Sequence, residues 1–273
     1  MNFFLRKVRD EIILPIRFFC VRQIMTFRRI FLKKGENKYL FILSPPYCGS
    51  TLLNLIISSS NNVSCNNNTG TREGQLLPKV NKIMFTKNRW DESLQYHWPT
   101  IKKYWHKYWD PNKDIWLDKS CPNIMRAIEV ENTFEDISFI MMTRNPYAQT
   151  EGIIRRNKED ATKAAEFSIQ CLKYQKRNLE KLKNKIFITY EELTQNPEKV
   201  KDILIDFVPK LKDITVDTKF ESHNFKTKGK MKISNLNQEK INKLSDEHLE
   251  AINKVFEKEK DLLNYFNYSI VKR

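Results

Sequence analysis

Short apolar runs alternate with longer amphipathic stretches along the chain. The apolar runs have the length and side chains of buried strands and cover 39–43, 115–118, 138–142 and 186–190. Helical periodicity covers 92–109, 159–184, 197–207 after Asn196, and 246–260 after Ser245. Strands that alternate with helices predict an α/β fold, with a central parallel sheet flanked by helices.

Residues 1–34 differ from the rest in pattern. Phenylalanine and isoleucine are interspersed with arginine and lysine, so no apolar run approaches the ~18 residues of a membrane-spanning helix. We expect a basic amphipathic segment at 1–34 and a single α/β domain at 35–273. The segment can lie on an anionic membrane or pack on the domain, and the sequence favours neither. No cleavage site follows a clean apolar core, so we expect no signal peptide.

The first predicted strand runs into a turn of small residues, Ser44 to Thr51, and then into a helix. Such a turn directs backbone N–H groups and the positive helix end at one spot, where an anion can bind. Gly49 lets the backbone approach the anion, and Ser50 and Thr51 add hydroxyl donors. Ser50 stands where a nucleotide triphosphate loop has lysine, so an ordinary ATPase or GTPase loop is not expected. A tight turn without a ligand is the alternative.

A second candidate lies after the apolar run 138–142. Arg144 follows the strand directly, and Pro146 can occupy the first turn of a helix. Ligands bind at the carboxyl edge of open parallel sheets, where an arginine can hold a phosphate through two hydrogen bonds. The sequence therefore predicts a second anion contact beside the first.

Together these segments resemble the sulfotransferases that use 3′-phosphoadenosine 5′-phosphosulfate (PAPS). The matching positions are Pro46, Gly49, Ser50 and Thr51 in the first turn and Arg144, Pro146, Tyr147 and Ala148 in the second. Two further segments, 117–123 and 188–198, are similar to family segments in the same order. The resemblance covers residues 38 to 256. It implies a P-loop nucleotide-binding type of fold and no metal requirement.

The resemblance also implies the donor site. Residues assigned to PAPS and to its product 3′,5′-ADP are Tyr47, Cys48, Gly49, Ser50, Thr51, Leu52, Arg144, Gly152, Tyr190, Lys228, Gly229 and Lys230. Two of these depart from the family pattern. Tyr47 stands where the family usually has lysine or arginine, and Gly152 stands where it tends to have serine.

Glu73 and Lys119 are the candidate catalytic residues. By resemblance, Glu73 takes the proton of the acceptor hydroxyl and Lys119 stabilises the charge of the transition state. An ordinary glutamate is a weak base, so we expect burial to raise its pKa. A solvated surface role for Glu73 is the alternative. A carbohydrate hydroxyl is the favoured acceptor, with protein tyrosine or a small alcohol left open. The rival interpretation is a sulfotransferase-like binding protein that has lost catalysis, because Tyr47 replaces the expected cation.

Charge and cysteine content restrict the remaining possibilities. Lysine and arginine number 48 against 33 aspartate and glutamate, a formal charge of +15, which favours anionic ligands in general. No zinc-finger or RNA-recognition pattern occurs, so nucleic acid is not expected as a partner. Five cysteines without paired spacing are typical of a reducing compartment and do not suggest zinc. We expect a cytoplasmic protein with possible membrane contact through 1–34, and the Golgi is not excluded.

Overall fold

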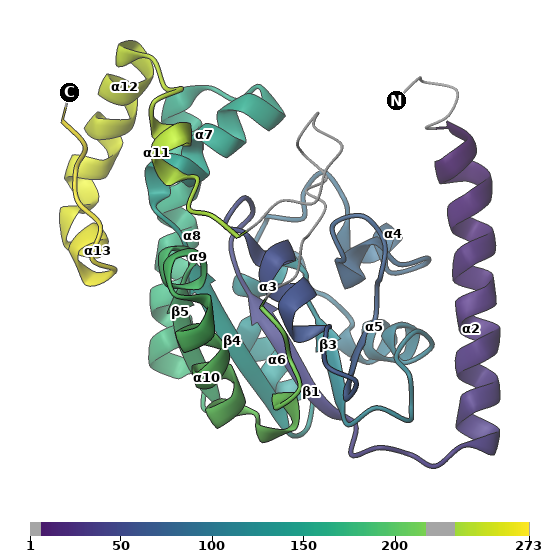
Figure 1. Ribbon diagram of the computed structural model, residues 1–273. Helices are drawn as coiled ribbons and strands as arrows, with labels where there is room; N and C mark the ends of the chain where they lie inside the picture. The colour runs from purple at the N-terminus through teal and green to yellow at the C-terminus, as the bar shows by residue number, and fades with distance from the viewer. Residues whose placement is uncertain (1–6, 217–232, 273) are drawn as a thin grey trace.

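The computed structural model describes residues 7–216 and 233–272 (Figure 1). Five parallel strands form one sheet in the order β2-β3-β1-β4-β5. The strands are β1 Lys38–Leu43, β2 Val63–Cys65, β3 Ile115–Asp118, β4 Ile137–Thr143 and β5 Lys185–Thr189. The predicted class, a central parallel sheet flanked by helices, is confirmed.

Both faces of the central strands are buried, which explains why β1 and β4 consist mainly of apolar residues. Alternate residues of β1 enter two different cores: Phe41 packs with aromatic side chains on one face, and Leu40 and Ile42 pack on the other. The aromatic core includes Trp105 of helix α5 (Trp98–Trp105), and the opposite core includes Leu53 of α3 (Ser50–Ile57).

The remaining helices cover the sheet or lie beside it (Figure 1). They are α2 Leu14–Phe31, α4 Asn81–Met84, α6 Ala127–Thr133, α7 Pro146–Asn157, α8 Ala161–Lys181, α9 Tyr190–Gln195, α10 Pro197–Phe207, α11 Asn237–Ile241, α12 Asp246–Phe256 and α13 Lys260–Tyr265. Short 3-10 turns occur at Gly74–Leu76, Cys121–Ile124, Pro209–Leu211 and Glu257–Glu259, and a π-helical turn, Arg9–Ile13, leads into α2.

Several element boundaries differ from the sequence prediction. Strand β2 was not predicted, because three residues with a central serine give no periodicity. Helix α5 is shorter than the predicted 92–109 and begins at Trp98, with Pro99 in its first turn. The predicted helix 246–260 ends at Phe256, where a 3-10 turn intervenes. Asn196 precedes α10 as predicted, but its side chain makes no capping hydrogen bond, whereas Asn145 accepts one from Tyr147 N in α7.

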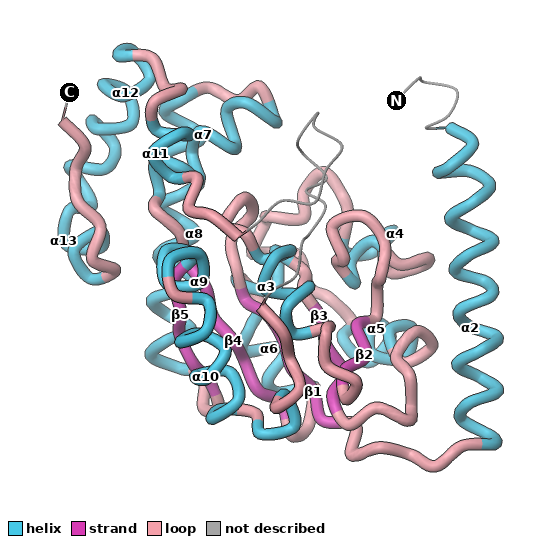
Figure 2. The backbone as a smooth tube through the Cα atoms, in the orientation of Figure 1, coloured by secondary structure: helices cyan, strands magenta, loops and turns pink. Residues whose placement is uncertain are grey.

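Helix α2 stands apart from the sheet and is joined to β1 by an irregular segment (Figure 2). It carries four arginines in 18 residues. Within residues 7–216 and 233–272, no helix has both the length and the apolar character needed to cross a membrane.

A glutamine from α8 lies between the ends of two central strands. The fully buried Gln175 donates from Nε2 to the carbonyl oxygens of Leu43 in β1, at 2.8 Å, and Met142 in β4, at 2.9 Å. The last paired residues of these strands are Leu43 and Met141. Beyond this point, the two strands lead into separate loops at the carboxyl edge of the sheet.

Candidate functional site

The loop after β1 has the geometry of an anion site. Gly49 adopts a left-handed conformation, with φ of 87°, and Ser50 begins α3 directly after it. In the described part of the chain, the backbone N–H groups of Gly49, Ser50 and Thr51 donate to no protein acceptor. A helix start with free N–H groups and a positive macrodipole attracts a phosphate-sized anion.

Tyr190 contacts both predicted anion elements. A Cβ atom on Gly49 would lie 2.6 Å from Cδ2 of Tyr190, so the ring excludes every larger residue at this position. The guanidinium carbon of Arg144 lies 3.9 Å from the centroid of the same ring. Tyr190 therefore links the loop to the arginine, and its assignment to the donor site stays a prediction.

Arg144 is held rigidly but keeps one unpaired nitrogen. It is 5% exposed; its Nε donates to Asn237 Oδ1 at 2.7 Å, and its Nη1 donates to the carbonyl oxygen of Tyr47 at 3.0 Å. Nη2 is buried and has no hydrogen-bond partner among the described residues. A buried charged donor without a partner is costly, which makes Nη2 the natural contact for a bound anion.

Asn237 and Glu191 were not predicted as site residues, yet they position Arg144. The carboxylate of Glu191 accepts hydrogen bonds from the Asn237 side chain and, at 2.8 Å, from Asn145 N. Glu191 lies within a segment that resembles the family, which was the available signal. No motif marks position 237 itself, so only the fold brings Asn237 to this site.

The two departures from the family pattern contact each other. Tyr47 has a left-handed backbone, with φ of 66°, and its hydroxyl donates to Asn157 Oδ1 at 2.8 Å. A Cβ atom on Gly152 would lie 2.9 Å from both Cβ and Cγ of Tyr47. The tyrosine ring thus occupies the space that a side chain at position 152 would fill.

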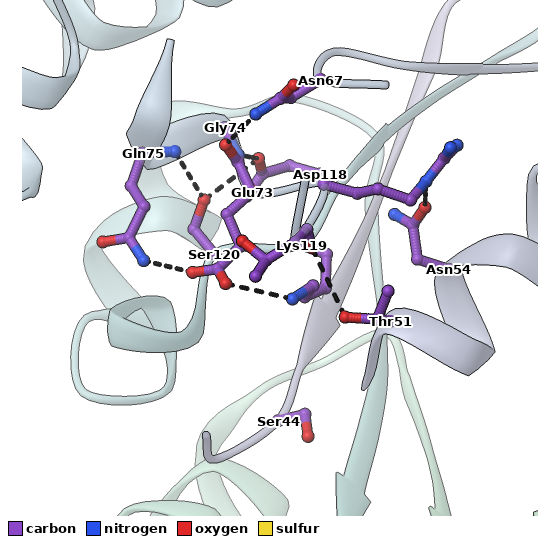
Figure 3. A network of polar contacts seen from close by, with 12 residues as sticks. Ser44, Thr51, Asn54, Asn67, Glu73, Gly74, Gln75, Asp118, Lys119 and Ser120 are labelled. Atoms are coloured by element: carbon purple, nitrogen blue, oxygen red, sulfur yellow. Dashed lines mark hydrogen bonds and ion pairs between the residues drawn. The ribbon is translucent and has the colours of Figure 1, made fainter. Parts of the chain in front are cut away.

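Glu73 and Lys119 form a buried ion pair between a loop and the end of β3 (Figure 3). Lys119 Nζ lies 3.3 Å from Glu73 Oε1, and the two residues are 2% and 9% exposed. Gln75 donates to the other carboxylate oxygen of Glu73. The structure therefore brings both predicted catalytic residues together, and Glu73 is not a solvated surface group.

The ion pair changes the expected ionisation of Glu73. Burial on its own raises the pKa of Glu73, but the Lys119 ammonium and hydrogen bonds to the carboxylate outweigh burial and hold the pKa below its ordinary value. Burial lowers the pKa of Lys119, and the Glu73 carboxylate outweighs it, so this pKa is raised. The expectation that burial raises the pKa of Glu73 is wrong, because the partner charge dominates.

Asp118 organises the backbone around Glu73. One of its carboxylate oxygens accepts hydrogen bonds from Gly74 N at 3.1 Å and Asn66 Nδ2 at 2.8 Å, and the other accepts from Asn123 Nδ2 at 3.0 Å. Burial raises the pKa of Asp118 to about 6. A Cβ atom on Gly74 would lie 2.1 Å from Asp118 Oδ1, so this contact depends on glycine.

Cys48 and Leu52 were also predicted to contact PAPS, but their side chains are buried. Both side chains belong to a hydrophobic core, so only their backbone can face a ligand. Burial raises the pKa of the Cys48 thiol well above its ordinary value, opposite to the effect of a helix end. Lys228, Gly229 and Lys230 lie outside the described residues.

A hollow of about 520 Å³ opens beside α4, in the segment that follows Glu73. Its lining is Ile83, Thr86, Lys87, Asn88, Leu94, Gln95 and Tyr96. The hydroxyl oxygens of Thr86 and Tyr96 are buried and find no hydrogen-bond partner in the described ranges. Burial raises the pKa of Tyr47 and of Tyr96, and Arg89 opposes both shifts, so the hollow and the loop after β1 share a cationic neighbour.

The parallel sheet, the glycine-opened helix and the buried arginine at its carboxyl edge define an α/β protein of the P-loop type. A model of the sulfotransferase family matches residues 40–209, and the chain therefore belongs to this family. A comparison with curated proteins found no significant match.

Solved sulfotransferase structures share the fold at low sequence identity. The sulfotransferase domain from the curacin biosynthetic pathway is 18% identical, with a TM-score of 0.50, covering 86% of this chain and 99% of that one. Sulfotransferase STF9 from Mycobacterium avium is 12% identical, with a TM-score of 0.54 and coverages of 93% and 83%. A sulfotransferase from Alicyclobacillus acidocaldarius is 12% identical, with a TM-score of 0.50 and coverages of 85% and 97%.

Proposed function

We propose that the chain transfers a sulfuryl group from PAPS to a hydroxyl of an acceptor, with carbohydrate as the favoured acceptor class. The observation that carries this proposal is the buried Arg144 with its unpaired Nη2, held beside the free N–H groups of the loop after β1. The loop N–H groups and Arg144 Nη2 are two neighbouring sets of hydrogen-bond donors, and they fit a ligand that carries two separate phosphate groups. Membership of the sulfotransferase family supports the choice of PAPS.

In this proposal the loop N–H groups and Arg144 bind different parts of PAPS. The N–H groups of Gly49, Ser50 and Thr51 hold the 5′-phosphosulfate, and Arg144 holds the 3′-phosphate. The ring of Tyr190 keeps the Arg144 guanidinium in place through their 3.9 Å contact. When bound, the donor supplies the sulfuryl group and leaves as 3′,5′-ADP.

Glu73 and Lys119 serve the transfer step. The acceptor oxygen forms a bond to sulfur while the bond from sulfur to the 5′-phosphate oxygen breaks, and the acceptor proton passes to Glu73. Its lowered pKa keeps Glu73 ionised at neutral pH, but it also makes the carboxylate a weaker base than an ordinary glutamate. Lys119 stays charged and can stabilise the negative charge that develops on the transferred group and the leaving phosphate.

We place the acceptor in the hollow beside α4. Its lining combines apolar side chains with amides and with the unpaired hydroxyls of Thr86 and Tyr96. A polyhydroxylated sugar offers hydrogen-bond donors and acceptors for such groups. Trp98 and Trp105 of α5 are buried in the aromatic core and are not part of this lining.

Calorimetric titration tests the donor site. We expect 3′,5′-ADP to bind without added metal, and 5′-ADP and ATP to bind more weakly, because only the bisphosphate reaches both anion contacts. Arg144→Ala removes the 3′-phosphate contact and is expected to weaken 3′,5′-ADP binding by roughly tenfold or more, as charged hydrogen bonds contribute about 1.5–3 kcal/mol. Binding of 5′-ADP should change little in this variant. Equal affinity of the wild type for the three nucleotides would refute the PAPS assignment.

A second candidate function is a nucleotide- or glycan-binding protein without catalysis. The observation that favours it concerns position 47, where the family usually has a lysine or arginine. Here the position holds Tyr47, whose side chain packs on Gly152. Transfer of radiolabelled sulfate from PAPS separates the two functions. If the wild type transfers sulfate and Lys119→Ala abolishes transfer while 3′,5′-ADP still binds, the protein is an enzyme. If transfer is absent in the wild type and appears in Tyr47→Arg, the binding function is correct.

A further inference from the structure

Large apolar side chains are concentrated on one exposed face of α2, the turn before it and Leu32 directly after it. Nine of them are 47–69% exposed: Ile12, Ile13, Ile16, Phe19, Ile24, Phe27, Ile30, Phe31 and Leu32. Among the described residues, only Phe85 and Tyr265 are other large apolar side chains with comparable exposure. An exposed apolar face of this extent is typical of an interaction site.

The opposite face of α2 packs on the domain. The ring of Phe18 lies edge-on to Tyr108, with centroids 5.9 Å apart, and Arg28 forms an ion pair with Asp110. Arg29 Nη2 donates to the carbonyl oxygen of Trp109 at 3.1 Å. These contacts fix the rotation of the helix, so its apolar face is directed away from the domain.

The border of this face is strongly cationic. Residues 12–35 contain six arginines and lysines and no aspartate or glutamate. The neighbouring domain surface adds to this charge: burial lowers the pKa of Lys107, and the positive charges of Arg22, Lys79 and Lys103 lower it further. Asp110 neutralises Arg28, but residues 12–35 offer no acidic partner to the other five cations, which favours an anionic surface beside the apolar face.

We propose that α2 binds the surface of an anionic membrane, with its apolar face in the headgroup region and its axis in the membrane plane. Four side chains spaced three, eight and three residues apart, Ile16, Phe19, Phe27 and Ile30, enter the lipid. The arginines and lysines on the border pair with lipid phosphates or carboxylates. A second copy of the chain is the alternative occupant, but it would bring two cationic borders together, which opposes association.

Sedimentation of the full chain with lipid vesicles tests this proposal. We expect binding to vesicles of phosphatidylcholine with phosphatidylserine, weaker binding to phosphatidylcholine alone, and release at high salt. The double variant Phe27→Ser/Ile30→Ser is expected to reduce the partition coefficient by about tenfold or more, because two large apolar groups no longer enter the lipid. Its melting temperature should match the wild type, since both side chains are more than half exposed.

Tyr265→Ser is the matched control. Tyr265 is 46% exposed and lies in α13, on the other side of the molecule from α2 (Figure 1). This variant should bind vesicles like the wild type. The proposal is overturned if the wild type does not bind anionic vesicles, or if the double variant binds them equally well. It is also overturned if light scattering shows a dimer that the double variant abolishes, because a second copy then covers the face.

Discussion

The contact between Tyr47 and Gly152 predicts that the two positions are energetically coupled. A new Cβ on Gly152 would lie 2.9 Å from Cβ and Cγ of Tyr47 and 3.3 Å from its Cδ1. We expect Gly152→Ala to be unfavourable in the wild type and favourable in a Tyr47→Gly background. Tyr47→Gly is suited to this test because glycine adopts the positive φ of position 47 without strain.

The size of the coupling follows from two opposing effects. Alanine in place of glycine inside α7 stabilises a helix by about 1 kcal/mol. Overpacking against a fixed side chain costs about 1–3 kcal/mol. Gly152→Ala alone should therefore destabilise by between about zero and 2 kcal/mol. Without the Tyr47 side chain only the helix effect remains, so the coupling free energy should be about 1–3 kcal/mol.

Urea denaturation of the four proteins, followed by tryptophan fluorescence, measures this coupling. The wild type, the two single variants and the double variant form a complete double-mutant cycle. Equal slopes with denaturant concentration would show that the midpoints report stability alone. If the two substitutions are additive within about 0.5 kcal/mol, the contact does not exist in solution and the reasoning fails.

Three further predictions concern buried polar groups. Lys119→Met should lower the free energy of unfolding, measured by urea denaturation, by about 3–5 kcal/mol, because Glu73 remains buried without its partner. Adding Glu73→Gln should restore much of this loss. If it restores none, the ion pair is contradicted. Gly74→Ala should lower the melting temperature by ~5 °C or more, since its Cβ would overlap a buried carboxylate oxygen at 2.1 Å, and an unchanged melting temperature would contradict this geometry. His106 donates to or accepts from Tyr39 OH at 2.7 Å, and burial lowers its pKa to about 4, so only the unfolded state takes up a proton as pH falls below about 6.5. The wild type should therefore lose more stability between pH 7 and pH 5 than His106→Gln, and equal losses would contradict the shift.

Most of the sheet could be predicted from sequence because its strands are buried on both faces. A run such as Tyr39–Leu43 has no polar position and can only be a core element. Strand β2 and the beginning of α5 could not be placed, because the short strand has a serine at its centre and Pro99 fixes the helix start inside a periodic segment. Local patterns therefore identify strongly buried elements, while tertiary packing selects the boundaries of the others.

The candidate site was predictable only where it lies in local motifs. Gly49 and Arg144 follow strands directly, so the topology brings them to one edge of the sheet. The contact of Tyr47 with Gly152 joins positions more than a hundred residues apart, and no periodicity reports it. The pKa direction of Glu73 was also beyond sequence reasoning, because it depends on which cation lies next to a buried carboxylate.

Gln175 has a consequence for the architecture of the site. By donating to the carbonyl oxygens of Leu43 and Met142, its amide occupies the hydrogen-bonding positions that would continue the pairing of β1 with β4. The amide therefore ends the pairing of these two strands at Leu43 and Met141, and beyond this point the two strands separate. Helix α8 thus determines the separation of the two loops that bind the anion, although it contributes no group to the candidate site. Gln175→Leu should leave the anion-binding residues intact and still weaken binding, because the spacing between them would no longer be held.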